Sequence, residues 1–152
     1  YELGWNYRFT NLQAAIGLAQ LERLTEFVDR KRRMGEMYTN LFYDLIDKVE
    51  LPLTKTEYAD NIYWVFGIIL KDTVPFNAEE AMKQLAAEGI GSRPFFYPMH
   101  QQPVFNELGW YINETYPVAE RMAERGLYIP SGLALTADEM KEVSEALHKI
   151  LK

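Results

Sequence analysis

Apolar side chains recur at helical spacing along the first part of the chain. The repeat starts at Leu12 and reaches about Asp47, with the three- or four-residue spacing that is typical of an amphipathic helix. Thr10 precedes the repeat, and Gln13 lies three residues after Thr10. This spacing is the pattern of a capping box. A single helix of this length is unusual in a globular domain, so we predict two helices with a break at residues 24–25.

The middle of the chain changes to a β pattern. Residues 61–71 are rich in β-branched and aromatic side chains, and their nearly continuous apolar character predicts a central strand that is covered on both faces. A helix is predicted from Asn77, its N-cap, through Glu88, with Gly89 as its C-cap. Residues 91–100 then form a short extended segment that contains two prolines.

The last part of the chain alternates between helix and strand. A short helix is predicted over residues 117–125, ending at Gly126, and a short strand over residues 127–130. Thr136 and Glu139 form a second capping box, which opens a final amphipathic helix. This order of elements predicts an α+β fold in which long N-terminal helices precede a small sheet covered by helices.

Composition and charge exclude several classes of protein. With 152 residues, of which 48% are hydrophobic, the chain fits one domain with a substantial core. It has no cysteine, which excludes disulfides, thiolate metal sites and a cysteine nucleophile, and a cytoplasmic setting is expected. The net charge of −6 is not that of a nucleic-acid-binding protein. The longest apolar run is too short to span a bilayer, so a membrane is not an expected partner.

Most charged residues are predicted to lie on the surface. The basic cluster at residues 30–33 is surrounded by Glu26, Asp29 and Glu36 in a helical pattern, which indicates a solvated helix face. His148, on the polar side of the last predicted helix, is expected to be exposed. All eight lysines are interpreted as surface residues, since none lies in an apolar motif that would lower its pKa.

Arg93, Tyr97 and His100 lie in the extended segment whose prolines restrict the backbone. A stiff loop that carries three polar groups can bind a ligand with little loss of entropy. The same residues also allow a structural interpretation, in which Arg93 pairs with a carboxylate, the neighbouring aromatic residues enter the core and His100 is a surface residue.

Asn6 and Arg8 lie just before the N-terminus of the first predicted helix. An amide and a guanidinium in this position favour a phosphate or carboxylate group. The alternative is that Asn6 caps a local turn and Arg8 pairs with an acidic neighbour.

Residues 4–22, GWNYRFTNLQAAIGLAQLE, strongly resemble the G-x-N-Y-R-M-T-x-L-Q-A-A-I-G segment of the DegT/DnrJ/EryC1/StrS aminotransferases. These are pyridoxal-phosphate-dependent enzymes of nucleotide-sugar biosynthesis. The resemblance continues in order at residues 63–67 and 91–105, and it ends with short motifs between residues 119 and 136. Phe9 stands where methionine is usual. The motifs look most like those of the perosamine-synthase branch.

This resemblance implies that residues 1–152 are the C-terminal small domain of an aspartate-aminotransferase-like, type I pyridoxal-phosphate fold. Residues 1–24 would link it to a large domain, absent from this sequence, that carries the cofactor-binding lysine. The chain alone is therefore expected to be inactive. The full-length enzyme would be a homodimer that uses pyridoxal 5'-phosphate to transfer an amino group, usually from glutamate as the amino donor, to a nucleotide-linked keto-sugar in amino-sugar and polysaccharide biosynthesis.

The resemblance also implies roles for single residues. Asn6 would hold the cofactor phosphate of the other subunit, and Arg8 would support that phosphate or the sugar diphosphate. Tyr97 and His100 would contact the keto-sugar, while Arg93 is either structural or close to the nucleotide. No catalytic residue and no metal ligand is expected in the chain.

Two alternatives to the aminotransferase remain open. One is a stand-alone binding or dimerisation module. The other is a piece of a related pyridoxamine-dependent sugar dehydratase, in which a histidine replaces the cofactor-binding lysine.

Overall fold

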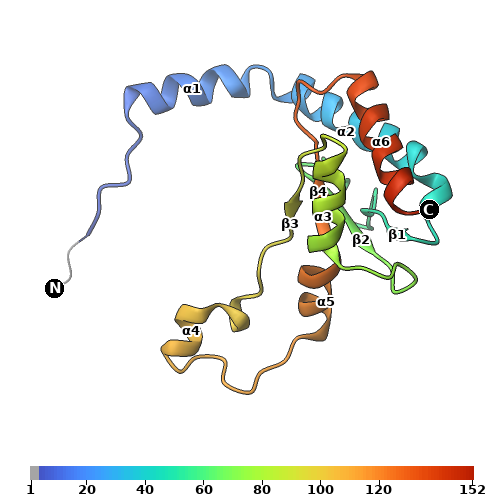
Figure 1. Ribbon diagram of the computed structural model, residues 1–152. Helices are drawn as coiled ribbons and strands as arrows, with labels where there is room; N and C mark the ends of the chain where they lie inside the picture. Colours follow the sequence, from blue (N-terminus) through green and yellow to red (C-terminus); the bar gives the residue numbers. More distant parts are fainter. Residues whose placement is uncertain (1–3) are drawn as a thin grey trace.

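The computed structural model describes residues 4–152; residues 1–3, where the linking segment is predicted to begin, lie outside the described residues. Figure 1 shows an extended N-terminal arm, a body in which helices pack around a small sheet, and an excursion that leaves the body and returns to it. We call residues 4–24 the arm and residues 95–116 the excursion. The combination of helices with one small sheet confirms the predicted mixture of helix and strand.

Two consecutive helices form the N-terminal part of the chain, as predicted. Helix α1 (Asn11–Leu21) starts with a complete capping box, in which Thr10 Oγ1 accepts from Gln13 N at 3.3 Å and Gln13 Oε1 accepts from Thr10 N at 2.9 Å. Helix α2 (Leu24–Leu41) follows after a break at residues 22–23. The break lies close to the predicted one.

The strands form one antiparallel sheet in the order β1-β2-β4-β3, with the bounds β1 (Val49–Glu50), β2 (Phe66–Leu70), β3 (Arg93–Pro94) and β4 (Gly126–Ile129). Strand β2 is central, as predicted. However, Phe66, Ile68 and Leu70 are buried whereas the two residues between them are only half-buried. Because alternate side chains point to opposite faces, the prediction of full cover on both faces is wrong.

The predicted strand over residues 61–71 is also wrong in its first half. Tyr63 has a φ of 50°, in the left-handed region that strands do not use. Its N–H donates to Asn61 Oδ1 at 2.7 Å, and its buried ring lies against Gly35 of α2, where an added Cβ would be 2.3 Å from Tyr63 Cδ2. This packing turns the chain sharply and delays the start of the strand.

The remaining helical elements are η1 (Tyr43–Leu45), α3 (Ala78–Ala87), η2 (Met99–Gln101), α4 (Pro103–Glu107), α5 (Pro117–Arg125) and α6 (Ala137–Ile150). Helices α2, α3 and α6 supply the core with fully buried side chains such as Tyr38, Leu85 and Leu147, which join the buried side chains of β2 and β4. Asn77 caps α3 through its Oδ1, 3.1 Å from Glu80 N. The predicted N-caps of α3 and α6 are thus confirmed, whereas the C-cap of α3 is Glu88 and not the predicted Gly89.

The first residue of the excursion covers part of the second face of the sheet. The Phe95 ring stacks on Tyr128 of β4 with 4.5 Å between centroids. It lies over Gly126, where an added Cβ would be 2.5 Å from Phe95 Cδ2, and over Gly67, where the corresponding distance to Cζ is 2.8 Å. Only residues without a side chain admit the ring at these two positions.

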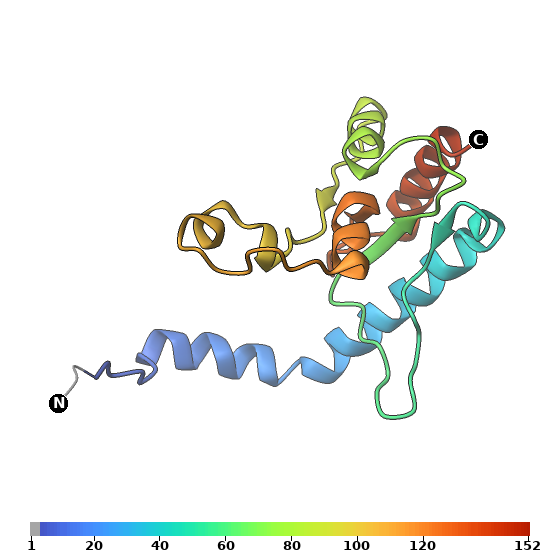
Figure 2. The ribbon, with the colours of Figure 1, turned by 90° about the horizontal axis from the view of Figure 1, so that it is seen from below.

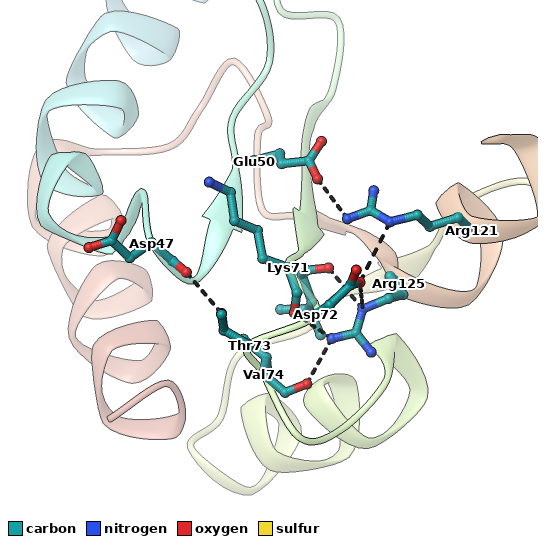
Figure 3. Close-up of polar contacts among 9 residues, drawn as sticks. Asp47, Glu50, Lys71, Asp72, Thr73, Val74, Arg121 and Arg125 are labelled. Carbon is teal, nitrogen blue, oxygen red and sulfur yellow. Dashed lines mark hydrogen bonds and ion pairs between the residues drawn. The ribbon is translucent and has the colours of Figure 1, made fainter.

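Two arginines clamp α5 to the end of the sheet (Figure 3). Arg125 donates to three backbone carbonyls of the turn at residues 70–74, at 2.6 to 2.9 Å. Arg121, one turn earlier, contacts Glu50 of β1 at 2.7 Å. Because a planar guanidinium holds several acceptors at once, the position of α5 on the body is fixed.

Within residues 4–152, no helix combines the length and apolar character needed to cross a membrane.

Candidate functional site

Asn6 and Arg8 lie, exposed, in the extended part of the arm before α1. Asn6 Oδ1 accepts from Arg8 N at 3.2 Å, so Asn6 does cap a local turn. No carboxylate in residues 4–152 pairs with the Arg8 guanidinium. The Asn6 side-chain N–H groups and the guanidinium therefore remain as donors beside a helix N-terminus, a set that fits a phosphate group.

The arm around these donors is apolar and uncovered. Trp5, Tyr7 and Phe9 are 74%, 89% and 83% exposed, and α1 buries no residue. Arg8 is the only charged residue between Gly4 and Leu21. Large apolar side chains exposed in such number on one segment indicate a binding surface.

Arg93 lies on the edge strand β3 and lines a groove of about 530 Å³, whose wall includes Val65, Ser92, Tyr128 and Ser131. The carboxylate partner considered from the sequence does not exist among the residues that the structure describes. The groove thus combines one guanidinium with two serine residues, a composition suited to an anionic group.

Tyr97 and His100 follow on the excursion and have opposite environments. The Tyr97 residue is 57% exposed, and its carbonyl accepts from Gln102 Nε2 at 3.1 Å. The His100 side chain is only 7% exposed, with Nε2 2.8 Å from Glu120 Oε1 and its ring 4.9 Å from that of Tyr116. The interpretation of His100 as a surface residue is therefore wrong.

The five candidate residues occupy three separate places within this chain: the arm, the groove beside β3 and the excursion. Figures 1 and 2 show that the arm and the excursion project from the same side of the body. The arrangement within this chain has donors for anionic groups and an exposed tyrosine. It holds no cluster, within residues 4–152, of three or more His, Asp or Glu side chains that could bind a metal ion.

The basic cluster at residues 30–33 is more than a solvated helix face. Lys31 is half-buried, and burial lowers the pKa of its ammonium group. It donates to the carbonyl of Ser131, and Arg30 donates to the carbonyl of Leu133 at 2.6 Å. Two of the four cations therefore hold the loop between β4 and α6, which helical spacing alone did not indicate.

The expectation of an exposed His148 is also wrong. Its side chain is half-buried, with Nε2 3.0 Å from Asp44 Oδ1 and Nδ1 2.7 Å from the carbonyl of Ser144. Burial alone would lower the pKa of His148, but the contacts with Asp44 and Ser144 outweigh it and raise that pKa. The hydrogen bond to His148 lowers the pKa of Asp44 in turn. This pair joins η1 to α6.

Comparisons with known proteins agree on one family and one fold. The model of the DegT/DnrJ/EryC1/StrS aminotransferase family matches residues 1–148. GDP-perosamine synthase from Vibrio cholerae is 34% identical over 145 residues, which cover 95% of this chain and 38% of the relative. The chain thus spans little more than a third of that relative's length.

Two solved structures share the fold. Helicobacter pylori PseC, an aminotransferase involved in the biosynthesis of pseudoaminic acid, superposes with a TM-score of 0.86 at 16% identity, over 99% of this chain and 40% of PseC. The GDP-4-keto-6-deoxy-D-mannose-3-dehydratase of E. coli, with bound hydrated PLP, gives 0.78 at 22% identity, over 95% of this chain and 36% of the dehydratase.

Proposed function

The chain belongs to the DegT/DnrJ/EryC1/StrS aminotransferase family, whose members are pyridoxal phosphate enzymes, and from this premise we propose that it is the C-terminal small domain of a sugar aminotransferase. The complete enzyme transfers an amino group, from glutamate, to a nucleotide-linked keto-sugar. The observation that carries the proposal is the family motif at residues 4–22, whose Asn6 and Arg8 keep free donors beside α1.

The chain contributes binding groups in this proposal, and the region of the relatives that it does not match contributes the cofactor-binding lysine. The matched segment is 38% of the Vibrio cholerae synthase. None of the eight lysines is fully buried, and the half-buried Lys31 already donates to the carbonyl of Ser131. We therefore expect the isolated chain to be inactive.

Asn6 and Arg8 hold the cofactor phosphate across a homodimer interface. Pyridoxal phosphate, when bound, carries the amino group and serves as the electron sink of the reaction. The Asn6 amide and the Arg8 guanidinium bind and orient its phosphate, close to the N-terminus of α1. An arm that buries none of its own side chains reaches away from the body, which supports a site shared with a second subunit.

Arg93 and Tyr97 face the nucleotide-linked sugar. The unpaired guanidinium of Arg93, with the serines of its groove, attracts the diphosphate. The exposed Tyr97 ring offers an apolar surface and a hydroxyl to the sugar. A substrate of the perosamine type, a 4-keto-6-deoxy sugar, is favoured by the identity with the Vibrio cholerae synthase.

A second candidate is a sugar dehydratase that uses pyridoxamine phosphate. It is favoured by the likeness to the E. coli dehydratase, which covers 95% of this chain. An amino-acid-dependent formation of the amino sugar by the complete enzyme supports the aminotransferase. Loss of a sugar hydroxyl without amino transfer supports the dehydratase.

The phosphate role is tested by replacing Asn6 in the complete enzyme. We expect Asn6→Ala to weaken binding of pyridoxal phosphate by about tenfold, since one hydrogen bond to a charged group contributes roughly 1.5–3 kcal/mol in full and less where solvent replaces it. Absorbance titration with the cofactor measures the affinity. Asn11→Ala, another exposed position of the arm, is the matched control. Equal affinities of the two variants and the wild type would contradict the phosphate role.

A further inference from the structure

We infer that His100, Tyr116 and Glu120 form a clasp that closes the base of the excursion and positions Tyr97, so that His100 is a positioning residue and not a ligand of the sugar. The clasp is argued from the geometry of this chain. Only its consequence for Tyr97 rests on the proposed function.

Glu120 is the centre of the clasp. Its Oε1 accepts from Tyr116 N at 2.8 Å and contacts His100 Nε2 at 2.8 Å. A carboxylate can only accept, so Nε2 of His100 carries the hydrogen. The bond from Tyr116 and then that from His100 lower the pKa of Glu120, which keeps it ionised and the two bonds charge-assisted.

The clasp joins the two ends of a long loop. His100 lies in η2 near the start of the excursion, and Tyr116 is the N-cap of α5 at its end. Between them the excursion packs on itself, with the Phe105 and Trp110 rings stacked at 5.3 Å. Figure 2 shows this part standing away from the sheet. Its position relative to the body therefore depends on its base.

The chain is anchored to the body on both sides of Tyr97. Downstream, the clasp is attached to α5, which Arg121 and Arg125 clamp to the body (Figure 3). Upstream, Phe95 is fixed by its stacking on Tyr128. Tyr97 lies between Phe95 and His100, and its own side chain reaches the surface. The anchors hold the backbone while the tyrosine remains free for contact, which lowers the entropy lost on binding.

Hydrogen–deuterium exchange of this chain tests the clasp without an assay of enzyme activity. Glu120→Ala is compared with Glu124→Ala, an exposed glutamate one turn later on α5. We expect amides of residues 101–115 to exchange at least about tenfold faster in Glu120→Ala only, because local opening becomes easier, while α6 stays protected. Unchanged exchange in a folded Glu120→Ala variant would overturn the clasp.

A second pair of variants decides the question if Glu120→Ala does not fold. His100→Gln keeps an N–H donor for Glu120, whereas His100→Leu keeps only bulk. Slow exchange in the glutamine variant and fast exchange in the leucine variant support the clasp. Equal exchange in the two variants overturns it.

The complete enzyme tests the consequence for Tyr97. In the variants that open the clasp, Glu120→Ala and His100→Leu, we expect the KM for the keto-sugar to rise by about tenfold. The kcat should change less than about threefold, and the cofactor affinity should be unchanged. His100→Gln should keep the KM of the wild type, which would not be the case if the imidazole contacted the sugar directly. A faster exchange without a change in KM would overturn the positioning of Tyr97. Absence of activity on any nucleotide keto-sugar would refute the proposed function, while the exchange experiment still decides the clasp.

Discussion

Helices α1 and α6 begin in the same way and lie in opposite environments. Each starts with a complete capping box, built by Thr10 and Gln13 in α1 and by Thr136 and Glu139 in α6. Helix α6 buries five of its residues in the body, whereas α1 buries none. The large apolar side chains of α1 are all more than half exposed, namely Leu12, Ile16, Leu18 and Leu21.

This difference shows that a local signal can start a helix without deciding what the helix packs against. A capping box satisfies backbone donors within one turn, but most helical stability in proteins comes from the packing of an apolar face. With 11 residues, α1 is too short to be stable in water without such packing. Its apolar surface is therefore available for binding, in keeping with the proposed role of the arm at a subunit interface.

The largest effect expected from this comparison is that of truncating one leucine in each helix. Leu147 of α6 is fully buried, whereas Leu18 of α1 is 58% exposed. We expect Leu147→Ala to lower the free energy of unfolding by about 2–5 kcal/mol and Leu18→Ala to change it by less than about 0.5 kcal/mol. Urea denaturation followed by circular dichroism measures both. Similar losses in the two variants would show that the arm packs on the body in solution.

A smaller effect is expected from adding one methyl group to a glycine in each region. At Gly126, an added Cβ would lie 2.4 Å from the Met122 carbonyl oxygen and 2.5 Å from the Phe95 ring, whereas at Gly17 it meets nothing within 4 Å. Gly126→Ala should cost about 1–3 kcal/mol through overpacking. Gly17→Ala should not destabilise the body. The same denaturation experiment compares them, and a harmless Gly126→Ala would contradict the packing of Phe95 on the sheet.

The smallest effect concerns the pH dependence of the body, which comes from the pair His148 and Asp44. The pKa of His148 is raised on folding, so its contribution is full below its ordinary pKa of about 6.5 and is lost as the pH rises through the raised value. The pKa of Asp44 is lowered, so its contribution is lost as the pH falls through that value.

The pair is tested by unfolding the wild type and Asp44→Asn in urea at several pH values. The stability difference between them should be largest near pH 5 to 6 and should decrease as the pH rises through the raised pKa of His148. Glu57→Gln, an exposed carboxylate without an ion pair in residues 4–152, should show no such dependence. A difference that stays constant from pH 5 to 8 would contradict the ion pair.

The sequence by itself determined the features that depend on short-range chemistry. The starts of α1, α3 and α6 follow from side-chain caps at Thr10, Asn77 and Thr136, each confirmed by the structure. The family motif at residues 4–22 identified the cofactor class. The predicted mixture of long helices and a small sheet also held, because apolar periodicity reports which segments can bury a face.

Only the tertiary structure decided the environment of each polar side chain. The late start of β2 after Tyr63, the half-burial of Lys31 and His148, and the inward position of His100 all depend on partners far away in the sequence. Lys31 and Ser131, for example, are 100 residues apart. Short elements such as β1 and α4 were not predicted, because two to five residues are too few to show a periodic pattern. The burial and the pairing of a side chain depend on its tertiary contacts, and residue spacing along the sequence does not predict those contacts.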